Sequence, residues 1–387
     1  MSQPISWDKY YQAYPINEKT IWLNNCGTTP ASRFIVEEMH NFLESSAREG
    51  TESTTYVYPR IKAEIQEIFA RLINTSPEHI ALLHNTAEGM NMVSHGISLR
   101  PGDQILLMED EYPSNVYPWE HWREKGVTLT FIPLADTPEA FLENVHKCIT
   151  NRTRLIALSI VHWCTGMPLP IREISVLCKE QGILLAVDAA QAVGHVQIDM
   201  DEWGVPFLAF SCWKWLLGPV GMGCLVVPGW ALQYVKPLFK GPDSVIDSAR
   251  YLPYRNQLKP TTEQFMYSTG NLADWVYART SLKMLEGIGF GQVQQRLYEL
   301  AAYLSGQLRS RGFRLPADKY TNNQPDDTWH TAIIVADKPG LDTSRAVQEL
   351  KSRGVITRER SGRIRFAPHI YNSFEQPDKI GAILDSL

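Results

Sequence analysis

The sequence predicts an α/β protein whose larger domain is a mostly parallel seven-stranded sheet with helices on both faces, followed by a smaller α+β domain. Seven short apolar runs recur along the first part of the chain. Several are continuous rather than alternating, which is typical of strands covered on both faces. Amphipathic segments of helical periodicity lie between them, and strands that alternate with helices form parallel sheets.

The expected strands and helices of the larger domain can be read in chain order. The apolar runs are "HIALLH", "QILLMED", "LTFIPL", "RLIALSIV", "ILLAVD", "FLAFS" and "GCLVVP". In "YPRIKAEIQEIFARLIN", Ile61, Ile65, Ile68 and Leu72 fall on one face of a helix. "IREISVLCKEQG" has the same periodicity and ends in Gly182, a residue suited to a helix C-terminus.

The sequence changes character after about residue 262. The stretch "DSARYLPYRNQLKPTTEQFMYSTGN" is irregular, and a long helical segment follows from Ala273 to Ser310, interrupted at "GIGFG". Shorter strands, "TAIIVA" and "GRIRFAP", and a helix at 342–353 come next. We therefore expect an N-terminal segment near the active site (1–15), a large domain (16–262) and a small C-terminal domain (263–387).

Composition excludes several classes of function. Of the 387 residues, 44% are hydrophobic and 20% are charged, the balance of a soluble globular protein. The net charge of −5 argues against nucleic acid or an acidic membrane as a partner. No apolar run has spanning length and the start does not resemble a signal peptide, so a cytoplasmic location is expected. The six cysteines form no C-x-x-C pair and the histidines show no metal-ligand spacing, so we expect buried thiols and no metal.

Polar residues follow the apolar runs, where an open parallel sheet binds its ligands. Asp188 and Gln191 follow "ILLAV", and Ser211 and Lys214 follow "FLAF". The segment 85–88, "NTAE", follows "IALLH" and opens a helix whose free N–H groups suit a phosphate. Lys214 lies between two tryptophans in an otherwise uncharged run. Its stem could lie along the rings with its charge in water, or its amine could be desolvated and reactive.

These groups together match the needs of pyridoxal 5'-phosphate (PLP). The aldehyde of PLP needs a lysine, and its ring nitrogen needs an anionic partner that keeps it protonated. Its phosphate needs a helix N-terminus and hydroxyl groups. Asp188 and Lys214 supply the two diagnostic groups.

Nearly the whole chain resembles the class V aminotransferase family of fold-type I PLP enzymes. This family includes cysteine desulfurases, cysteine C–S lyases, isopenicillin N epimerase-like proteins and kynureninase. "WLNNCGTTP" is similar to its opening strand and substrate loop, and "HNTAEGMN" to its phosphate loop. "VDAAQAVGHVQID" resembles its Asp-x-x-Gln signature and "SCWKWLLGPVGMG" its lysine segment. "YSTGN" resembles the stretch that reaches a partner subunit's phosphate, and "RIRFAPHIYNS" the C-terminal arginine motif.

The resemblance implies a role for each matching residue. Lys214 would bind the aldehyde and move protons, Asp188 would pair with the ring nitrogen, and Gln191 would lie near the phenolic oxygen. Arg365 would bind the substrate α-carboxylate through its guanidinium fork. The other positions implied in cofactor or substrate binding are Thr86, Ala87, Ser211 and Thr269 (phosphate, the last from the partner subunit of a homodimer), Tyr112 and Trp213 (cofactor ring), and Asn25 and Thr28 (substrate).

Four positions depart from the family pattern. Tyr112 replaces the histidine that stacks on the ring, and Trp213 the histidine before the lysine. Cys164 stands where relatives often carry asparagine, and Ala87 replaces a threonine. A tyrosine can stack but is a poor acid or base at neutral pH. These changes indicate a site remodelled for a less usual reaction.

The expected reaction begins with removal of the α-hydrogen of a free amino acid. No cysteine follows Cys224, so the loop before the C-terminal arginine lacks the thiol that cysteine desulfurases need. We expect β- or γ-elimination, or elimination with cyclisation, in small-molecule biosynthesis. The chain also resembles the cyclase that forms enduracididine from γ-hydroxyarginine, a substrate whose guanidinium would need a carboxylate such as Asp8, Glu88, Asp110 or Glu111. Transamination, racemisation and a non-catalytic regulatory role remain as alternatives.

Overall fold

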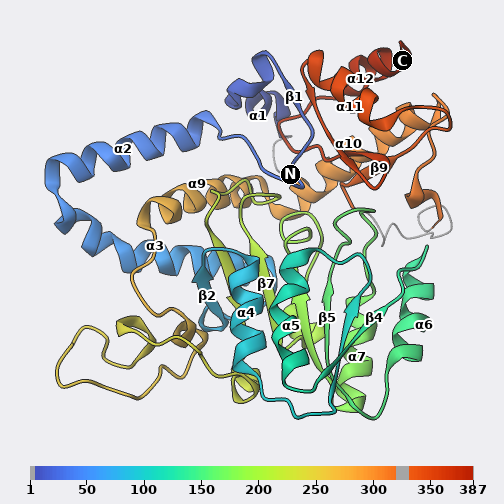
Figure 1. The fold of residues 1–387 in the computed structure, drawn as a ribbon. Coiled ribbons are helices and arrows are strands. Elements are labelled where there is room, and N and C mark those ends of the chain that lie inside the picture. The colour runs from blue at the N-terminus through green and yellow to red at the C-terminus, as the bar shows by residue number, and fades with distance from the viewer. Residues whose placement is uncertain (1–4, 320–330, 387) are drawn as a thin grey trace.

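The computed structural model describes residues 5–319 and 331–386. Its central feature is a seven-stranded sheet in the order β2-β8-β7-β6-β5-β3-β4 (Figure 1). The strands are β2 (Ile80–Leu83), β3 (Gln104–Met108), β4 (Thr128–Ile132), β5 (Thr153–Ser159), β6 (Leu184–Asp188), β7 (Phe207–Ser211) and β8 (Gly223–Val226). β8 runs antiparallel to both neighbours and the other pairs are parallel. The seven apolar runs of the sequence are these seven strands.

Helices cover both faces of this sheet, as expected. The helices are α1 (Trp7–Ala13), α2 (Arg33–Glu49), α3 (Thr51–Leu72), α4 (Thr86–Gly96), α5 (Tyr117–Glu124), α6 (Pro138–Cys148), α7 (Ile171–Gln181), α8 (Met200–Trp203), α9 (Leu272–Ile288), α10 (Phe290–Arg309), α11 (Thr343–Ser352) and α12 (Gln376–Leu384). The β3-α5-β4 crossover runs one way along the sheet, whereas β4-α6-β5 and β5-α7-β6 run the other way. Because parallel crossovers are right-handed, α5 lies on one face and α6 and α7 on the other.

Helix ends follow the local chemistry of the sequence. Gly182 ends α7 in the left-handed conformation with φ 66°, which costs glycine no steric strain. Gly289, with φ 96°, separates α9 from α10 and accounts for the interruption at "GIGFG". Asn85 caps α4, because its side chain accepts a hydrogen bond from the N–H of Glu88. In the part of the chain that the structure describes, no helix is long and apolar enough to cross a membrane.

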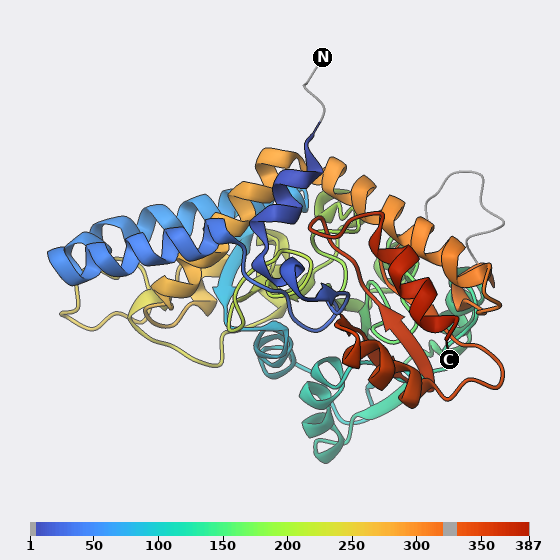
Figure 2. The same ribbon diagram turned by 90° about the horizontal axis from the view of Figure 1, so that it is seen from above.

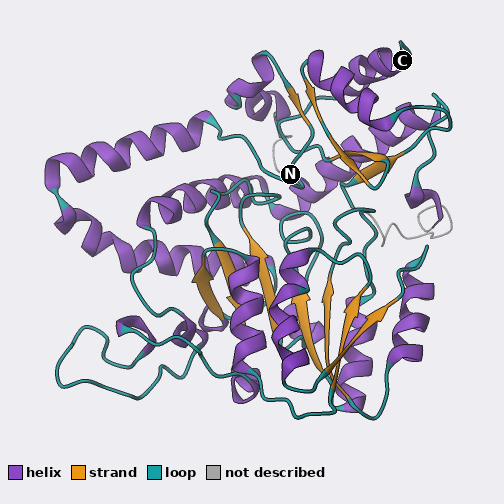
Figure 3. Cartoon of the chain, viewed as in Figure 1, coloured by secondary structure: helices purple, strands orange, loops and turns teal. Residues whose placement is uncertain are grey.

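Two small sheets lie above the carboxyl ends of the large sheet (Figures 1 and 3). One is the antiparallel sheet β11-β12-β9, formed by β9 (Ile334–Ala336), β11 (Arg358–Arg360) and β12 (Arg363–Phe366). The other pairs β1 (Ile21–Trp22) with β10 (Val355–Ile356), so the start of the chain is joined to the C-terminal region. The ends of α2 and α3 that join each other project away from the rest of the fold (Figure 2), whereas the second half of α3 is buried through Ile61, Ile65 and Ile68.

Candidate active site

A cavity of about 350 Å³ lies at the carboxyl edge of the large sheet, between it and the small antiparallel sheet. Its volume is in the range of small-molecule binding sites. It is lined by Cys26, Gly27, Asn85, Thr86, Ala87, Tyr112, Ser114, Trp163, Asp188, Ala190, Gln191, Ser211, Trp213, Lys214, Arg360 and Arg365. Nine of the twelve residues to which a role was assigned from the sequence therefore meet here. Eight of them lie at or after strand ends at this edge of the large sheet, and Arg365 comes from β12 of the small sheet.

Lys214 and Asp188 are a buried amine and a buried carboxyl that both line the cavity. Both side chains are buried, and Lys214 makes no hydrogen bond or ion pair with any described residue. Burial lowers the pKa of Lys214, and the Asp188 carboxylate opposes this shift. Burial also raises the pKa of Asp188, whose carboxylate accepts a hydrogen bond from the N–H of Ala190 at 2.8 Å. A desolvated amine with an available lone pair is suited to attack a carbonyl or to remove a proton.

The first turn of α4 and the end of β7 form an anion site. The hydroxyls of Thr86 and Ser211 are 2.7 Å apart, and Ser211 also accepts from the N–H of Thr86. This places two hydroxyls beside a helix N-terminus, where backbone N–H groups and the helix dipole favour a phosphate. Gly223 permits the close approach, because a Cβ there would lie 2.7 Å from the Cα of Asn85.

Gln191 is held in one orientation beside the lysine segment. Its amide nitrogen donates to the carbonyl of Cys26 at 3.0 Å, and its amide oxygen accepts from the indole of Trp215 at 3.2 Å. Trp215 is fully buried and stacks on His195 with ring centroids 3.9 Å apart. Trp215 therefore holds the backbone next to Lys214 in place, and this fixes the direction in which the Lys214 side chain points.

Arg365 and two aromatic rings close the cavity from the side of the small sheet. Arg365 is buried and donates from Nη1 to the carbonyl of Trp163 at 2.6 Å. The rings of Tyr112 and Trp163 meet edge to face with centroids 5.6 Å apart. The Tyr112 ring centroid lies 5.6 Å from Lys214 Nζ, so this ring stands above the lysine.

Three residues with a role assigned from the sequence lie outside the cavity lining. The amide of Asn25 is used within the protein, because it donates to the carbonyl of Ala367 at 2.6 Å and accepts from the hydroxyl of Tyr371 at 2.7 Å. The carbonyl of Thr28 accepts from the indole of Trp22. Thr269 lines a separate surface hollow with His84 and Glu88, among others.

Among the residues at the site that had no assigned role, three matter for its chemistry. Trp163 and Arg360 line the cavity, and Glu111 lies behind it near Asp188. The arginines alternate in "RERSGRIR", which is a detectable sign of a hairpin with arginines on one face. Trp163, inside "HWCTG", has no comparable signal.

Glu111 is a buried carboxyl that accepts from the N–H and hydroxyl of Ser159 and from the N–H of Tyr112. Burial, with the charge of Asp188, raises the pKa of Glu111 to about 7. The folded protein therefore binds this proton more tightly than the unfolded chain. Its contribution to stability is complete below the unfolded pKa of about 4.5 and declines as the pH rises toward 7.

We expect the Glu111→Gln variant to lack this decline. Between pH 4.5 and 7, the cofactor-free wild type should lose roughly 3 kcal/mol of unfolding free energy relative to the variant. Urea unfolding at the two pH values measures the difference, with the exposed Glu109→Gln as the matched control. Parallel pH dependence of wild type and Glu111→Gln would show that the pKa of this carboxyl is the same in the folded and the unfolded protein.

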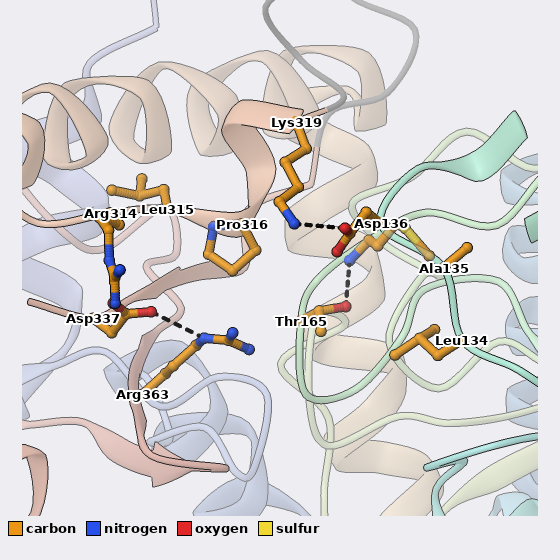
Figure 4. A pocket seen from close by; sticks show the side chains of 11 residues that line it. Leu134, Ala135, Asp136, Thr165, Arg314, Leu315, Pro316, Lys319, Asp337 and Arg363 are labelled. Atoms are coloured by element: carbon orange, nitrogen blue, oxygen red, sulfur yellow. Dashed lines mark hydrogen bonds and ion pairs between the residues drawn. The ribbon is translucent and has the colours of Figure 1, made fainter. Parts of the chain in front are cut away.

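A second, larger cavity of about 620 Å³ is lined by residues that follow β4 and β5 and by residues of the C-terminal region (Figure 4). Neither Lys214 nor Asp188 lines it. Its charged side chains are paired with one another: Lys319 with Asp136, and Arg314 and Arg363 with Asp337. Every charged residue that lines this cavity is therefore in an ion pair. We therefore place the reaction in the smaller cavity, where Lys214 and Asp188 lie.

The smaller cavity fits PLP group by group. Lys214 is the buried amine that an aldehyde requires, with no ion-pair partner among the described residues, and Asp188 is the buried carboxylate that a protonated ring nitrogen requires. Thr86, Ser211 and the start of α4 form the anion site. No group of three or more His, Cys, Asp or Glu side chains suited to a metal was found among the described residues.

Solved structures share this fold. A cysteine desulfurase from Thermococcus onnurineus matches with a TM-score of 0.86 at 22% identity, covering 100% of this chain and 99% of that one. A cystine C–S lyase in complex with cysteine persulfide matches with a TM-score of 0.85 at 21% identity, covering 96% and 98%. The fold and the site define a PLP-dependent enzyme of fold type I.

Sequence comparison identifies the family. The model of the aminotransferase class V family matches residues 21–365. A probable cysteine desulfurase of Pyrococcus abyssi is 24% identical, covering 96% of this chain and 95% of the relative. The chain belongs to the class V aminotransferase family.

Proposed function

We propose that this enzyme removes the α-hydrogen of a free amino acid with Lys214 and then eliminates a β or γ substituent, with or without cyclisation. The observation that carries this proposal is the hairpin before Arg365. β11 and β12 are joined by Ser361 and Gly362 alone, because Arg360 pairs with Arg363. A two-residue turn has no length for a mobile loop that would bring a sulfur-accepting thiol to the substrate.

Each residue of the cavity has a separate role in this reaction. Arg365 binds the α-carboxylate with a charge-assisted hydrogen bond and so orients the Cα–H bond toward Lys214. Lys214 Nζ accepts the proton and returns it, which its lowered pKa favours at neutral pH. When bound, PLP supplies the ring that delocalises negative charge from the α-carbon. Asp188 holds a proton on the ring nitrogen, and Thr86 and Ser211 hold the phosphate.

The charge of the cavity bears on the enduracididine-type reaction. None of the four carboxylates considered for a guanidinium group lines the cavity. Glu111 is engaged with Ser159, and Glu88 accepts from His84 at 2.7 Å. Arginine side chains line it instead, so γ-hydroxyarginine is one substrate to be tested rather than the preferred one.

Isotope exchange in heavy water separates the candidate reactions. We expect deuterium at Cα, and at Cβ when the leaving group is at γ, with no stoichiometric transfer of the amino group to the cofactor. A mass-spectrometric screen of hydroxylated, thiol-containing, acidic and basic amino acids measures this pattern. A keto acid formed together with the aminated cofactor would establish an aminotransferase, and inversion at Cα alone would establish a racemase.

We expect no cysteine to be required for turnover. Cys26 lines the cavity but is buried, which raises the pKa of its thiol, and Cys164 contacts the hydroxyl of Ser361 at 3.3 Å. Both behave as small buried side chains, so Cys26→Ser and Cys164→Ser should keep the exchange rate within about fivefold of wild type. Exchange abolished in Cys164→Ser, with cofactor bound and the fold intact, would assign a thiol to the reaction.

We also infer a homodimer with shared active sites. Thr269 lies outside the cavity of its own chain, and the segment before it exposes Leu238, Phe239 and Tyr254. Large apolar side chains exposed along one segment are typical of an interaction site. Mixing Lys214→Ala and Thr269→Ala chains should restore activity at one of the two sites, because that site combines an intact lysine with an intact threonine. A fully active monomer in solution would contradict the shared site.

A further inference from the structure

The β11–β12 hairpin carries four arginines on one face. Arg358 pairs with Arg365 and Arg360 pairs with Arg363, and directly paired residues of an antiparallel ladder share a face. Like charges placed opposite each other destabilise a hairpin. Of the four, Arg363 has a carboxylate partner, Asp337, at 3.2 Å. No described carboxylate lies within ion-pair distance of the other three.

Arg360 and Arg365 both line the active-site cavity. Nη1 of Arg360 donates to the carbonyl of Glu359 at 2.8 Å, and its Cζ lies 5.7 Å from the ring centroid of Trp163. Its Nε is buried and has no hydrogen-bond partner among the described residues. The guanidinium is therefore held in place, but its hydrogen-bonding capacity is only partly used. Burial and the nearby charge of Arg365 lower the pKa of Arg360, which is the electrostatic cost of leaving the two cations without an anion.

The cofactor phosphate has an anion site of its own, on other elements than the hairpin that carries Arg360. The phosphate site is formed by Thr86, Ser211 and the start of α4 on the large sheet, whereas Arg360 lies on the hairpin next to Arg365. Arg360 and Arg365 are diagonal neighbours across the ladder, so their Cα atoms are roughly 7–8 Å apart. This spacing suits two carboxylates joined by a short carbon chain.

We propose that Arg360 forms a second anion subsite, and that the substrate is an amino acid whose side chain carries a second carboxylate. Arg365 binds the α-carboxylate and Arg360 binds the distal one. This inference rests on the proposed function, because it takes Arg365 as the α-carboxylate site, and it adds the substrate class.

Binding of ligands that lack an amino group tests the subsite without turnover. Glutarate and valerate have the same chain length but differ by one carboxylate, as do succinate and butyrate. Titration calorimetry on the PLP-loaded wild type should show about tenfold tighter binding of each dicarboxylate, the effect expected of one charge-assisted contact. Arg360→Gln should remove this preference and leave the affinity for valerate unchanged, and Arg360→Lys should keep part of it.

Arg358→Gln is the matched control, since it removes the same charge from the same strand and face but lies outside the cavity lining. It should retain the preference, whereas Arg365→Gln should weaken both ligands. Equal affinity for glutarate and valerate in the wild type would overturn the subsite, even if no variant folds. Equal weakening of both ligands in Arg360→Gln would also overturn it, because both arginines would then hold one carboxylate. A dicarboxylate preference without deuterium exchange would overturn the proposed reaction and leave the subsite in place.

Discussion

Replacing Lys214 by alanine is expected to lower the rate of α-hydrogen exchange by about a thousandfold, the typical contribution of a positioned general base. Lys214 is the buried amine that lines the cavity beside Asp188, and the described residues offer it no ion-pair partner. The variant should also fail to hold PLP covalently. Exchange of amino-acid α-hydrogen in heavy water, followed by NMR, measures the rate.

Lys125 provides the matched control for this prediction. Its Nζ lies 4.3 Å from the centroid of the Trp122 ring, so it too is a lysine against a tryptophan, but it is exposed. Lys125→Ala should leave exchange unchanged. If Lys214→Ala exchanged as fast as Lys125→Ala, the protein would have another base, or the fold would serve a non-catalytic regulatory role.

Replacing Asp188 by asparagine should reduce exchange by about a hundredfold, the typical cost of removing one group that stabilises the charge developed during the reaction. Asp188 is buried and faces Lys214, so the variant leaves a positive group without compensation. The pH dependence of the visible cofactor absorption should shift in the variant as well, since an amide does not hold a proton on the ring nitrogen.

Two further variants serve as controls for the Asp188→Asn prediction. Asp188→Glu keeps the charge and should recover part of the rate, whereas Asp199→Asn removes a carboxylate that caps α8 and should have little effect on exchange. An Asp188→Asn variant with wild-type exchange and an unshifted absorption titration would remove Asp188 from the ring nitrogen.

The central sheet could be predicted from the sequence because each of its strands lies in an apolar run, and several of these runs are continuous. "ILLAVD" became β6 and "FLAFS" became β7, and parallel ladders bring Asp188 and Ser211 to one edge. The order of the strands, the antiparallel β8 and the long α2 helix were not visible at that level. The pairing of β1 with β10 depends on two residues in each strand, which is too short for a periodic signal.

The candidate site could be predicted where a polar residue directly follows a strand, and less well in loops. Asn25 and Thr28 lie in a loop without periodicity, so nothing in the sequence shows that the Asn25 amide points to Ala367 and Tyr371. Arg360 was not singled out because the importance of an arginine depends on which carboxylates are within reach. That depends on the packing of the hairpin against the large sheet, which only the structure shows.

The most direct test of this account is the chemical location of the cofactor. Reduction of the PLP-loaded protein with borohydride, followed by proteolysis and mass-spectrometric peptide mapping, identifies the lysine that carries it. We expect the label on Lys214, within "SCWKWLLGPVGMG", and none on Lys125. A label on any other lysine, or purified protein that takes up no PLP, would contradict the assignment of this cavity as the active site.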